Sequence, residues 1–416
     1  MRQRPPHSSA RSIVHSTARP VRRRLLHGVA VGCVVAGLAT AAPASASTAP
    51  TTPPTTPPGT VSADTVSTDT VSPVVAGEPF PDDRCAANHD AGTISYLTGF
   101  DYAAAASMID VFVAEQRGYY DDLCLDVEVT PSFSTDNYPV VAAGRAQFAS
   151  AGSFTEMATF AVANDADLVA VVVEGRSPAD VLILKPDTAT TLTDLRGDTI
   201  GVKGKITPSV AAMLAGAGLV EGRDYQTVLL DGFDPVAQIA LDGIVGFPGY
   251  RSNEPGALER AGIPFQVFDP IDDGIPGSFG VIYTTRSFVE DHPSAVEDFV
   301  RATMRGLNEA IADPDAAAQT ALDLIDASGN PNFLSPEGEA FRWQTESATI
   351  TADYADGDAS YGVPDPTLLQ AEVDAYDAVG LFGDAGTHAP TDLAPLIDTA
   401  PIDGAYGERN VVVWPA

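Results

Sequence analysis

The sequence predicts an α/β protein of two lobes, each a mostly parallel β-sheet flanked by helices, with a ligand cleft between the lobes. Three observations lead to this fold class. Strand-like and helix-like patterns alternate from residue 93 to residue 269, which is typical of parallel sheets covered by helices. The runs LVAVVVE and DVLILKP are continuously apolar over the length of a buried strand. Roughly 320 folded residues are more than one open sheet usually holds.

The alternation can be followed element by element. Strands are expected at residues 93–100, 125–133, 147–152, 168–174, 180–186, 198–204, 225–230, 244–250 and 265–269. Helices are expected at residues 103–120, 138–143, 154–164, 209–219, 235–243 and 254–262. In the first of these helices, Met108, Ile109, Phe112 and Val113 recur at helical spacing. From about Phe288 onward the chain is expected to be mostly helical.

Composition divides the chain into five parts. Residues 1–46 read as an export signal, and residues 47–80, rich in Thr and Pro, as a disordered tether. Residues 81–187 are expected to form the first part of lobe 1, residues 188–279 an inserted lobe 2, and residues 280–416 the rest of lobe 1 with a C-terminal helical region. A cleft between two such lobes is the default ligand site.

The export signal rests on the order of its segments. A basic stretch ending in RPVRRRLLH precedes an apolar run and the small-x-small site Ala44-Ser45-Ala46. General secretory export and the twin-arginine route both fit the arginine-rich stretch. Cys33 raises an alternative, because Ala30-Val31-Gly32-Cys33 partly resembles a lipobox and would anchor the chain to a lipid. The protein is therefore expected to be exported, either released or associated with the cell surface.

The charge balance excludes one class of partner. The chain carries 23 Lys+Arg against 56 Asp+Glu, a net charge of −33. Such an acidic surface repels phosphate backbones, so the sequence predicts no nucleic-acid binding.

Cleavage after Ala46 leaves two cysteines, Cys85 and Cys124. An even number of cysteines in an oxidising compartment indicates one disulfide, which closes a loop of about 40 residues and stabilises the fold by roughly 3–4 kcal/mol in the chain-entropy model. Two free buried thiols are the alternative.

Several strand-to-helix junctions carry side chains that can hold a polar ligand. In open α/β sheets such junctions collect ligands, because strand ends lead there into helix N-termini. An aromatic ring beside a carboxylate can stack on a flat ligand and accept hydrogen bonds from its amino groups. The three junctions with this chemistry are Phe100-Asp101-Tyr102, Ser153-Phe154-Thr155 and Tyr250-Arg251-Ser252-Asn253-Glu254. Capping and packing are the alternative roles of these residues.

The turn GVKGKITPSV contains two of the three lysines of the chain. It follows an expected strand, and Thr207 with Pro208 predicts the start of a helix. We expect Lys205 to face the cleft and Lys203 to belong to the strand end, with Thr207, Ser209 and backbone N–H groups as the direct ligand contacts. A solvated turn is the alternative.

Catalytic and metal-binding motifs are not found in the sequence. His89, His292 and His388 do not have HExxH or another metal-ligand spacing, and the chain contains no GxSxG, P-loop or GxGxxG motif after a strand. The sequence therefore predicts no enzyme activity, no metal and no cofactor.

At this point a family resemblance can be stated. YLTGFDYAAAASMIDVFVAEQRGYYDDLCLDVEV, GRAQFASAGSFTEMATFA, LTDLRGDTIGVKG, YRSNEPGALERAGIPF and GVIYTTRSFVEDHPSAVEDFVRATMRG follow one another in order. Together they resemble the solute-binding proteins of ABC importers for nitrate, sulfonates, taurine and thiamine-precursor pyrimidines, a pyrimidine synthase-like family. SNEPxxLxxxGIP is most similar to the thiamine-pyrimidine and riboflavin-type branch.

The resemblance implies the periplasmic-binding-protein type 2 fold and a monomer that delivers a small molecule to an ABC permease and ATPase. It places the ligand contacts at Phe100, Asp101, Tyr102, Ser153, Phe154, Thr155, Lys205, Thr207, Ser209, Tyr250, Asn253 and Glu254. A thiamine-precursor pyrimidine or a riboflavin-like heterocycle would stack on Tyr102, Phe154 or Tyr250 and pair with Asp101 or Glu254. A nitrate, sulfonate or taurine carrier, a pyrimidine-synthase-like enzyme, and a surface sensor or adhesin are the alternatives.

Overall fold

The computed structural model describes residues 71–329, 335–384 and 386–416. The expected export signal, including Cys33, and residues 47–70 of the expected tether lie outside the described residues. Residues 71–80 are held in place, although the sequence placed them in the disordered tether. The N–H of Gly77 donates to the carbonyl of Trp414, and the carbonyl of Glu78 accepts from the N–H of Ala416. The start of the described chain is thus fixed against its C-terminal end.

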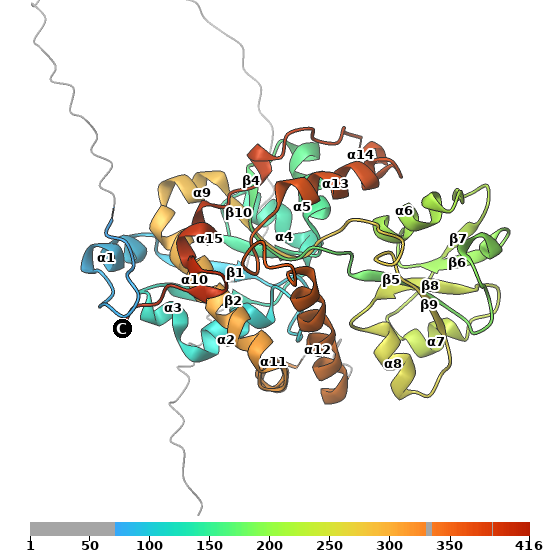
Figure 1. The fold of residues 1–416 in the computed structure, drawn as a ribbon, viewed down its shortest axis with the longest axis horizontal. Helices are drawn as coiled ribbons and strands as arrows, with labels where there is room; N and C mark the ends of the chain where they lie inside the picture. The colour runs from blue at the N-terminus through green and yellow to red at the C-terminus, as the bar shows by residue number, and fades with distance from the viewer. Residues whose placement is uncertain (1–70, 330–334, 385) are drawn as a thin grey trace, which may run out of the picture. The chain divides into compact units, whose positions relative to one another are not determined.

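The first sheet has five strands (Figure 1). Their order is β2 (Asp126–Thr130), β1 (Thr93–Leu97), β3 (Phe148–Ala151), β10 (Phe279–Thr285) and β4 (Leu168–Gly175). β1 runs parallel to both of its neighbours, whereas β10 runs antiparallel to β3 and to β4.

The second sheet repeats this arrangement. Its order is β7 (Gln226–Leu229), β6 (Thr199–Val202), β8 (Gly246–Tyr250), β5 (Asp180–Leu184) and β9 (Gln266–Phe268). β6 is parallel to β7 and β8, and β5 is antiparallel to β8 and β9. In each sheet four strands run in the same direction, as predicted for a mostly parallel sheet. The fifth strand, β10 or β5, runs the opposite way and arrives directly from the other sheet.

The chain passes between the sheets twice, after β4 and after β9. β5 belongs to the second sheet, so the first crossing lies before Asp180 and not at residues 187–188, where the sequence placed it. The apolar run DVLILKP that follows LVAVVVE is thus the first strand of the second sheet. Periodicity could not show this, because two consecutive buried strands look alike whichever sheet they join.

Helices cover both sheets. Around the first sheet lie α1 (Asp82–Asp90), α2 (Ile109–Arg117), α3 (Tyr119–Asp122), α4 (Ser134–Ala142), α5 (Phe154–Asn164), α9 (Arg286–Asp291), α10 (Pro293–Ala312), α11 (Pro314–Ser328) and α15 (Ala400–Ala405). With the second sheet lie the 3₁₀ helix η1 (Leu192–Leu195), α6 (Pro208–Gly216), α7 (Pro235–Ile239) and α8 (Glu254–Arg260). The C-terminal part adds α12 (Pro336–Asp353), α13 (Pro366–Asp377), α14 (Leu381–Asp384), the 3₁₀ helix η2 (Ala394–Leu396) and the hairpin strands β11 (Tyr406–Glu408) and β12 (Val411–Val412).

We call the first sheet with α1–α5 and α9–α11 the first lobe, the second sheet with α6–α8 the second lobe, and α12–α14 the C-terminal helices. Buried strands supply apolar side chains to both faces of their sheet. In β4, Val171 and Val172 pack into one core and Ala170 and Val173 into another. The α/β architecture with two sheets confirms the predicted fold class.

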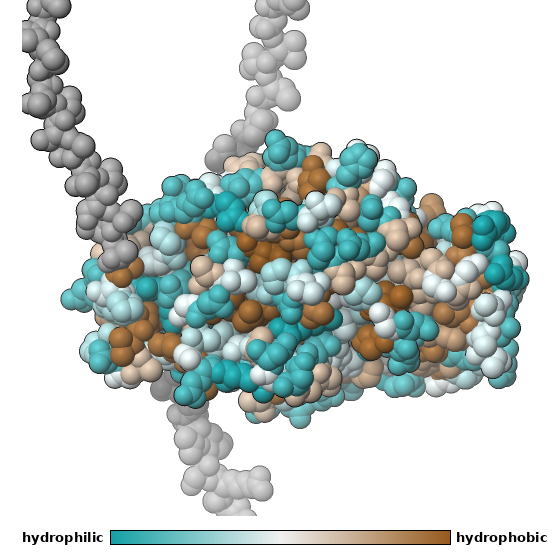
Figure 2. Space-filling model, turned by 45° about the horizontal axis from the view of Figure 1, so that its top comes forward, coloured by the Kyte–Doolittle hydropathy of each residue, from teal (hydrophilic) through white to brown (hydrophobic). Residues whose placement is uncertain are grey.

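On the face drawn in Figure 2, hydrophilic and apolar side chains are interspersed. Among the described residues, no helix is both long enough and apolar enough to cross a membrane.

Candidate functional site

The centre of the candidate site is formed by Asp180, the first residue of β5, and Tyr250, the last residue of β8. The two residues are directly opposite each other in the antiparallel pairing of these strands. Asp180 Oδ2 accepts a hydrogen bond of 3.2 Å from Ser209 Oγ, which belongs to the first turn of α6. The residue Tyr250 remains 53% exposed. One carboxyl, one hydroxyl and one accessible aromatic ring thus meet at the ends of two strands and the start of a helix.

The electrostatics of this centre are dominated by carboxyl groups. Burial raises the pKa of Asp180 to about 7, and the negative charge of Glu254 contributes, although the hydrogen bond from Ser209 works in the opposite direction. Burial also raises the pKa of the Tyr250 hydroxyl, and the charges of Asp180 and Glu156 raise it further. Glu156 belongs to α5 of the first lobe, so the site joins acidic groups of both lobes.

Lys203 and Glu254 form an ion pair next to this centre. Lys203 Nζ lies 2.8 Å from Glu254 Oε1, and the Glu254 side chain is only 2% exposed. The other carboxylate oxygen of Glu254 accepts the N–H of Tyr250 at 2.8 Å. Lys203, at the strand end as expected, therefore neutralises a buried carboxylate of the site and is not free to bind an anion.

Lys205 is in a different environment. Its ammonium group pairs with Asp384 of α14 at 3.0 Å, but the two side chains are 76% and 64% exposed. An ion pair this exposed contributes little to stability. The expectation that Lys205 faces the cleft remains a prediction.

The start of α5 is occupied by groups of the chain itself. Ser153 caps the helix by accepting the N–H of Glu156. The N–H of Phe154 donates to Ser278 Oγ at 2.8 Å. Phe154 is fully buried, so the prediction that its ring stacks on a ligand is wrong for this arrangement, because the ring packs into the core of the first lobe.

Helix α13 connects two of the predicted contact regions. Glu372 accepts hydrogen bonds from the hydroxyl of Thr155 at 2.7 Å and from its N–H at 3.2 Å. One turn later on the same helix, burial and the charges of Glu372 and Asp180 raise the pKa of the Tyr376 hydroxyl, and α13 also packs against α6, which carries Ser209. Glu372 and Tyr376 are four residues apart and so lie on one face of α13. The sequence did not single out either residue.

Helix α12 makes a second connection. Glu346 Oε1 accepts a hydrogen bond of 2.7 Å from Ser252 Oγ of the second lobe, and its other oxygen accepts the N–H of Ala106 of the first lobe. Arg342 donates to Asn253 Oδ1 at 3.4 Å. The C-terminal helices thus contact both lobes next to the site.

The alanine-rich segment after β1 is a loop, although the sequence predicted a helix from residue 103. α2 begins only at Ile109, and Asp101 and Ser107 have positive φ angles of 42° and 51°. Three backbone N–H groups of the loop donate to distant carboxylates: Ala104 to Glu339, Ala106 to Glu346 and Ser107 to Glu174. These long-range bonds replace the local bonds of a helix, and residue pattern alone does not reveal them.

The first predicted triplet is anchored within the first lobe. Phe100 packs edge-on against Phe133, with ring centroids 5.5 Å apart, and Tyr102 packs against Phe112 at the same distance. The N–H of Asp101 donates to the carbonyl of Ser132 at 2.8 Å. Whether this triplet reaches a bound ligand remains a prediction.

The remaining predicted residue, Thr207, precedes α6 as expected. It occupies the N-cap position, but its side chain forms no capping hydrogen bond. Its buried Oγ1 has no hydrogen-bond partner among the described residues. The structure therefore brings Thr207, Ser209, Tyr250, Asn253 and Glu254 to one end of the second sheet.

The sequence missed several residues of this cluster. Asp180 opens a strand that the sequence identified by its apolar residues only. Glu156, Glu346, Glu372 and Tyr376 lie inside helices, where one polar residue has no distinguishing signal in a single sequence. A separate surface pocket of about 600 Å³ is lined by Arg286, Gln370 and Asp398 among others, and by none of the predicted site residues.

The comparisons with known proteins agree with this architecture. The model of the family described as NMT1/THI5 like matches residues 105–317, which is about half of the chain. The chain belongs to this family. The resemblance found in the sequence is thereby confirmed, and the match includes both strands of the site, β5 and β8, but not the C-terminal helices.

Two curated relatives are similar over part of their length. The riboflavin-binding protein RibY of Chloroflexus aurantiacus is 30% identical over 207 residues, which are 48% of this chain and 54% of the relative. The formylaminopyrimidine-binding protein of Halalkalibacterium halodurans is 29% identical over 240 residues, 55% of this chain and 70% of the relative. The matched part of the chain thus spans about half the length of the first relative.

A solved structure extends the likeness in fold. The periplasmic sulfonate-binding protein SsuA of Methylobacillus flagellatus has a TM-score of 0.52 and 15% identity, over 75% of this chain and 92% of that protein. At this identity the likeness concerns the fold alone, and it agrees with the predicted two-lobed α/β fold.

Proposed function

We propose that the protein is a non-enzymatic solute-binding protein that captures a flat, amino-bearing heterocycle for uptake by an ABC transporter. A thiamine-precursor pyrimidine or a riboflavin-like molecule has the required chemistry. The fold and the family support a solute-binding role, and the names of the two curated relatives support this class of ligand.

The observation that carries the proposal is the grouping of Asp180, Ser209 and Tyr250. Asp180 forms no ion pair with any side chain in the described part of the chain, so its carboxyl can accept a hydrogen bond from a ligand N–H. The half-exposed ring of Tyr250 offers an aromatic face for a flat ring system. Thr207 and Ser209 add hydroxyl groups at the start of α6.

The same electrostatics disfavour the alternative of a nitrate, sulfonate or taurine carrier. An anion needs free cations or free N–H groups. Lys203 is paired with Glu254, and Arg251 forms an ion pair of 2.7 Å with Asp269. The N–H groups of the loop after β1 are bound by carboxylates of the chain. An anion would meet several acidic side chains and cations that are already neutralised.

The enzyme alternative needs a free lysine for pyridoxal phosphate. The three lysines of the chain all have partners: Lys203 and Lys205 form ion pairs, and Lys185 donates to the carbonyl of Leu241 at 2.6 Å. The sequence also contains no cysteine-rich CCCFC-type motif. Both observations support a binding protein rather than a synthase.

The proposal includes a location and partners. The basic and apolar N-terminal segment supports export, after which the protein acts outside the cytoplasm or at the cell surface as a monomer. An ABC permease and ATPase receive the solute. A surface sensor or adhesin would have the same fold but no such partners.

Thermal unfolding of the chain with a ligand panel tests the proposal. The panel contains aminopyrimidines, thiamine, riboflavin, taurine, alkanesulfonates and nitrate. A ligand at 100 times its dissociation constant adds about 2.7 kcal/mol of stability, enough to raise the melting temperature by several degrees. We expect this increase with aminopyrimidines or riboflavin. An increase only with sulfonates or nitrate contradicts the proposed ligand class, and a pyridoxal-type absorbance band contradicts the binding-protein role.

Matched variants locate the binding site. Asp180→Asn removes the charge of the acceptor and should weaken binding of the active heterocycle at least about tenfold, because hydrogen bonds to charged groups contribute roughly 1.5–3 kcal/mol. Glu259→Gln changes an exposed carboxylate on α8 and should leave affinity unchanged. Equal affinities of the two variants would place the ligand elsewhere.

A further inference from the structure

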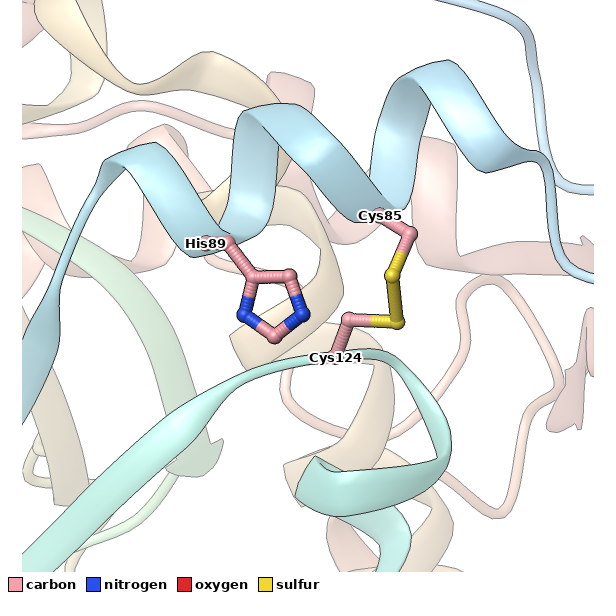
Figure 3. A group of neighbouring side chains, drawn as sticks. All are labelled: Cys85, His89 and Cys124. Atoms are coloured by element: carbon pink, nitrogen blue, oxygen red, sulfur yellow. A yellow bond between two sulfur atoms is a disulfide. The ribbon is translucent and has the colours of Figure 1, made fainter.

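Helix α1 places two metal-ligating side chains on one face. Cys85 and His89 are four residues apart, so they project in the same direction from the helix. Both point toward Cys124 on the neighbouring segment (Figure 3). The two sulfur atoms and an imidazole nitrogen all lie within 4.8 Å of one another. This cluster lies outside the candidate ligand site and has no role in the proposed function.

The oxidation state of Cys85 and Cys124 decides whether this cluster can bind a metal ion. In the structure Cys85 and Cys124 form a disulfide, as the sequence predicted, with Cα atoms 5.2 Å apart. As thiols, the same residues offer two thiolates and one imidazole, the ligand types that Zn²⁺ prefers. Ligand atoms of a tetrahedral zinc site lie about 3.3–3.8 Å apart, given Zn–S and Zn–N bonds of about 2.3 and 2.0–2.1 Å. The three ligand atoms of Cys85, His89 and Cys124 lie within 4.8 Å of one another, which is near this spacing.

We propose that Cys85, His89 and Cys124 bind one thiophilic divalent cation, such as Zn²⁺, when the two cysteines are thiols. Three protein ligands leave the fourth tetrahedral position to water. The disulfide and the metal are then alternative cross-links between α1 and the segment that contains Cys124.

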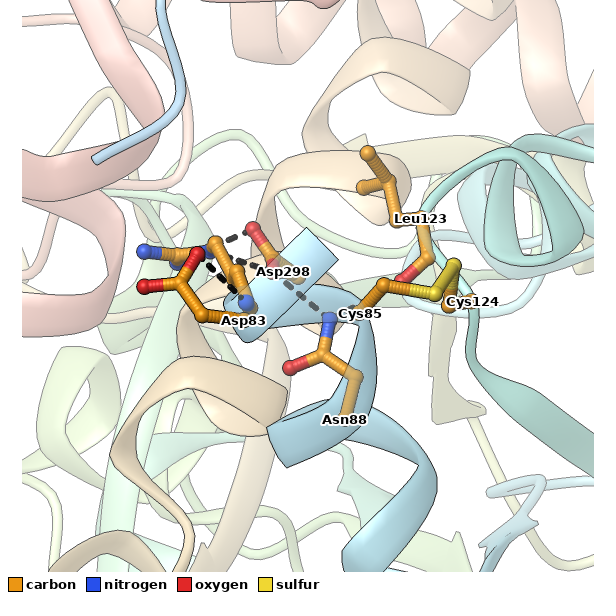
Figure 4. Close-up of a disulfide and its surroundings, with 7 residues drawn as sticks. Asp83, Cys85, Asn88, Leu123, Cys124 and Asp298 are labelled. Atoms are coloured by element: carbon orange, nitrogen blue, oxygen red, sulfur yellow. Dashed lines mark hydrogen bonds and ion pairs between the residues drawn. A yellow bond between two sulfur atoms is a disulfide. The ribbon is translucent and has the colours of Figure 1, made fainter. Parts of the chain in front are cut away.

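Buried hydrogen bonds hold α1 beside Cys124 in addition to the disulfide. Arg84, next to Cys85, donates to Asp298 of α10 at 2.6 and 3.0 Å. Asn88, next to His89, donates to Asp298 and to the carbonyl of Leu123, the residue before Cys124, at 2.7 and 2.9 Å (Figure 4). Arg84, Asn88 and Asp298 are buried. These bonds keep α1 beside Cys124 after reduction, so the three ligands stay preorganised.

Electrons and protons balance in the exchange between the disulfide form and the metal-bound form. A dithiol reductant supplies two electrons and two protons, the S–S bond breaks, and the reductant leaves as its own disulfide. The cation then displaces the two thiol protons, while His89 coordinates as the neutral imidazole. In the reverse step a disulfide oxidant takes two electrons from the bound thiolates and is itself reduced to two thiolates, which restores the Cys85–Cys124 disulfide and releases the cation.

Cobalt titration of the reduced protein tests the proposal. The full chain carries Cys33→Ser, so that Cys85 and Cys124 are its only thiols, and it has no histidine tag. After reduction by a phosphine and its removal without oxygen, Co²⁺ is added in the presence of excess Mg²⁺, which occupies weak sites on the acidic surface. We expect one equivalent of Co²⁺, a thiolate-to-cobalt charge-transfer band, and displacement by Zn²⁺.

Two variants separate the specific site from general cation binding. His89→Asn should weaken Co²⁺ binding at least about tenfold, since loss of even an outer partner of a ligand costs 10–100-fold. His292→Asn changes a histidine that packs against Phe288 and should bind Co²⁺ like the parent. Binding without a charge-transfer band, or equal affinity in both variants, overturns the proposal. Circular dichroism monitors the fold, and unfolding on reduction would refute the preorganised site.

Discussion

Lys203 Nζ lies 2.8 Å from Glu254 Oε1, and this pair connects the end of β6 to the first turn of α8. Glu254 also accepts the N–H of Tyr250. The lysine therefore neutralises a carboxylate that fixes the backbone of the aromatic residue proposed to stack on the ligand. The pair has a structural role at the site, and its position leaves Asp180 as the acidic group available to a solute.

The two lysines of the GVKGKITPSV turn should differ in their effect on stability. Lys203→Met leaves the buried Glu254 carboxylate without its cation, and we expect a loss of about 2–3 kcal/mol in the free energy of unfolding. Lys205→Met breaks an exposed pair and should cost less than about 1 kcal/mol. Calorimetric melting temperatures of both variants at neutral pH check the difference. Equal decreases would show that burial of Glu254 does not decide the energy of its pair.

Arg84 should be among the most sensitive charged residues of the first lobe. Its side chain is 4% exposed and its partner Asp298 is fully buried. Arg84→Met removes one of the two guanidinium groups that neutralise this carboxylate and leaves Arg301, whose Nε lies 3.0 Å from Asp298 Oδ1. We expect a loss of about 1.5–3 kcal/mol even with the disulfide intact, because hydrogen bonds to charged groups contribute this much.

The control for Arg84 is Arg223→Met, which removes a guanidinium that is 67% exposed from its pair with Asp224. This change should cost no more than about 1 kcal/mol. Thermal unfolding of both variants under non-reducing conditions provides the comparison. A small effect of Arg84→Met would mean that the disulfide alone holds α1, which would also remove the basis of the metal site proposed for the reduced chain.

The fold was predictable where local pattern and packing agree. The apolar runs that became β4 and β5 are buried on both faces, and residue type alone identifies them. The lobe boundary was harder to predict, because the apolar residues of β5 do not indicate which sheet the strand joins. The helix predicted from residue 103, in the loop after β1, was wrong for another reason. Its alanines favour a helix, but the carboxylates that hold it in place come from Glu174, Glu339 and Glu346, two of them more than 230 residues away.

The candidate site shows the same division. Tyr250 and Glu254 were found because they lie together at a strand-to-helix junction. Asp180 was missed, since it reaches Tyr250 only through the antiparallel pairing of β5 with β8. Glu372 and Tyr376 were missed because α13 returns to the site from the C-terminal part of the chain. Single-sequence reasoning thus finds site residues adjacent in sequence, and misses those that only the tertiary fold brings together.

Asp180 should make the stability of the ligand-free protein depend on pH. Its pKa is raised to about 7 in the folded state from 3.8, so the folded state binds more protons than the unfolded state between these values. The free energy of unfolding should therefore fall as pH rises from about 4 to about 7, by up to about 4 kcal/mol from this group.

Asp180→Asn removes this contribution, so the variant should lose less stability than the parent as pH rises. Other buried carboxyl groups with raised pKa values, such as Glu372, remain in both proteins and cancel in the difference. Asp272→Asn, at an exposed position, is the control. Melting temperatures between pH 4 and pH 8 measure the effect. Parallel curves for Asp180→Asn and the parent would show that Asp180 titrates normally.

Gly175, the last residue of β4 before the chain crosses to the second sheet, should not tolerate a side chain. A Cβ atom there would lie 1.9 Å from the ring of Phe279, which is buried in the neighbouring strand β10. Gly175→Ala should therefore cost about 1–3 kcal/mol through overpacking. Gly216→Ala, at the exposed end of α6 where no atom lies within 4 Å of the added Cβ, should stabilise the protein by up to about 1 kcal/mol. Calorimetry of both variants tests the pair. A neutral Gly175→Ala would mean that the Phe279 ring can move aside and that the packing at this crossing is loose.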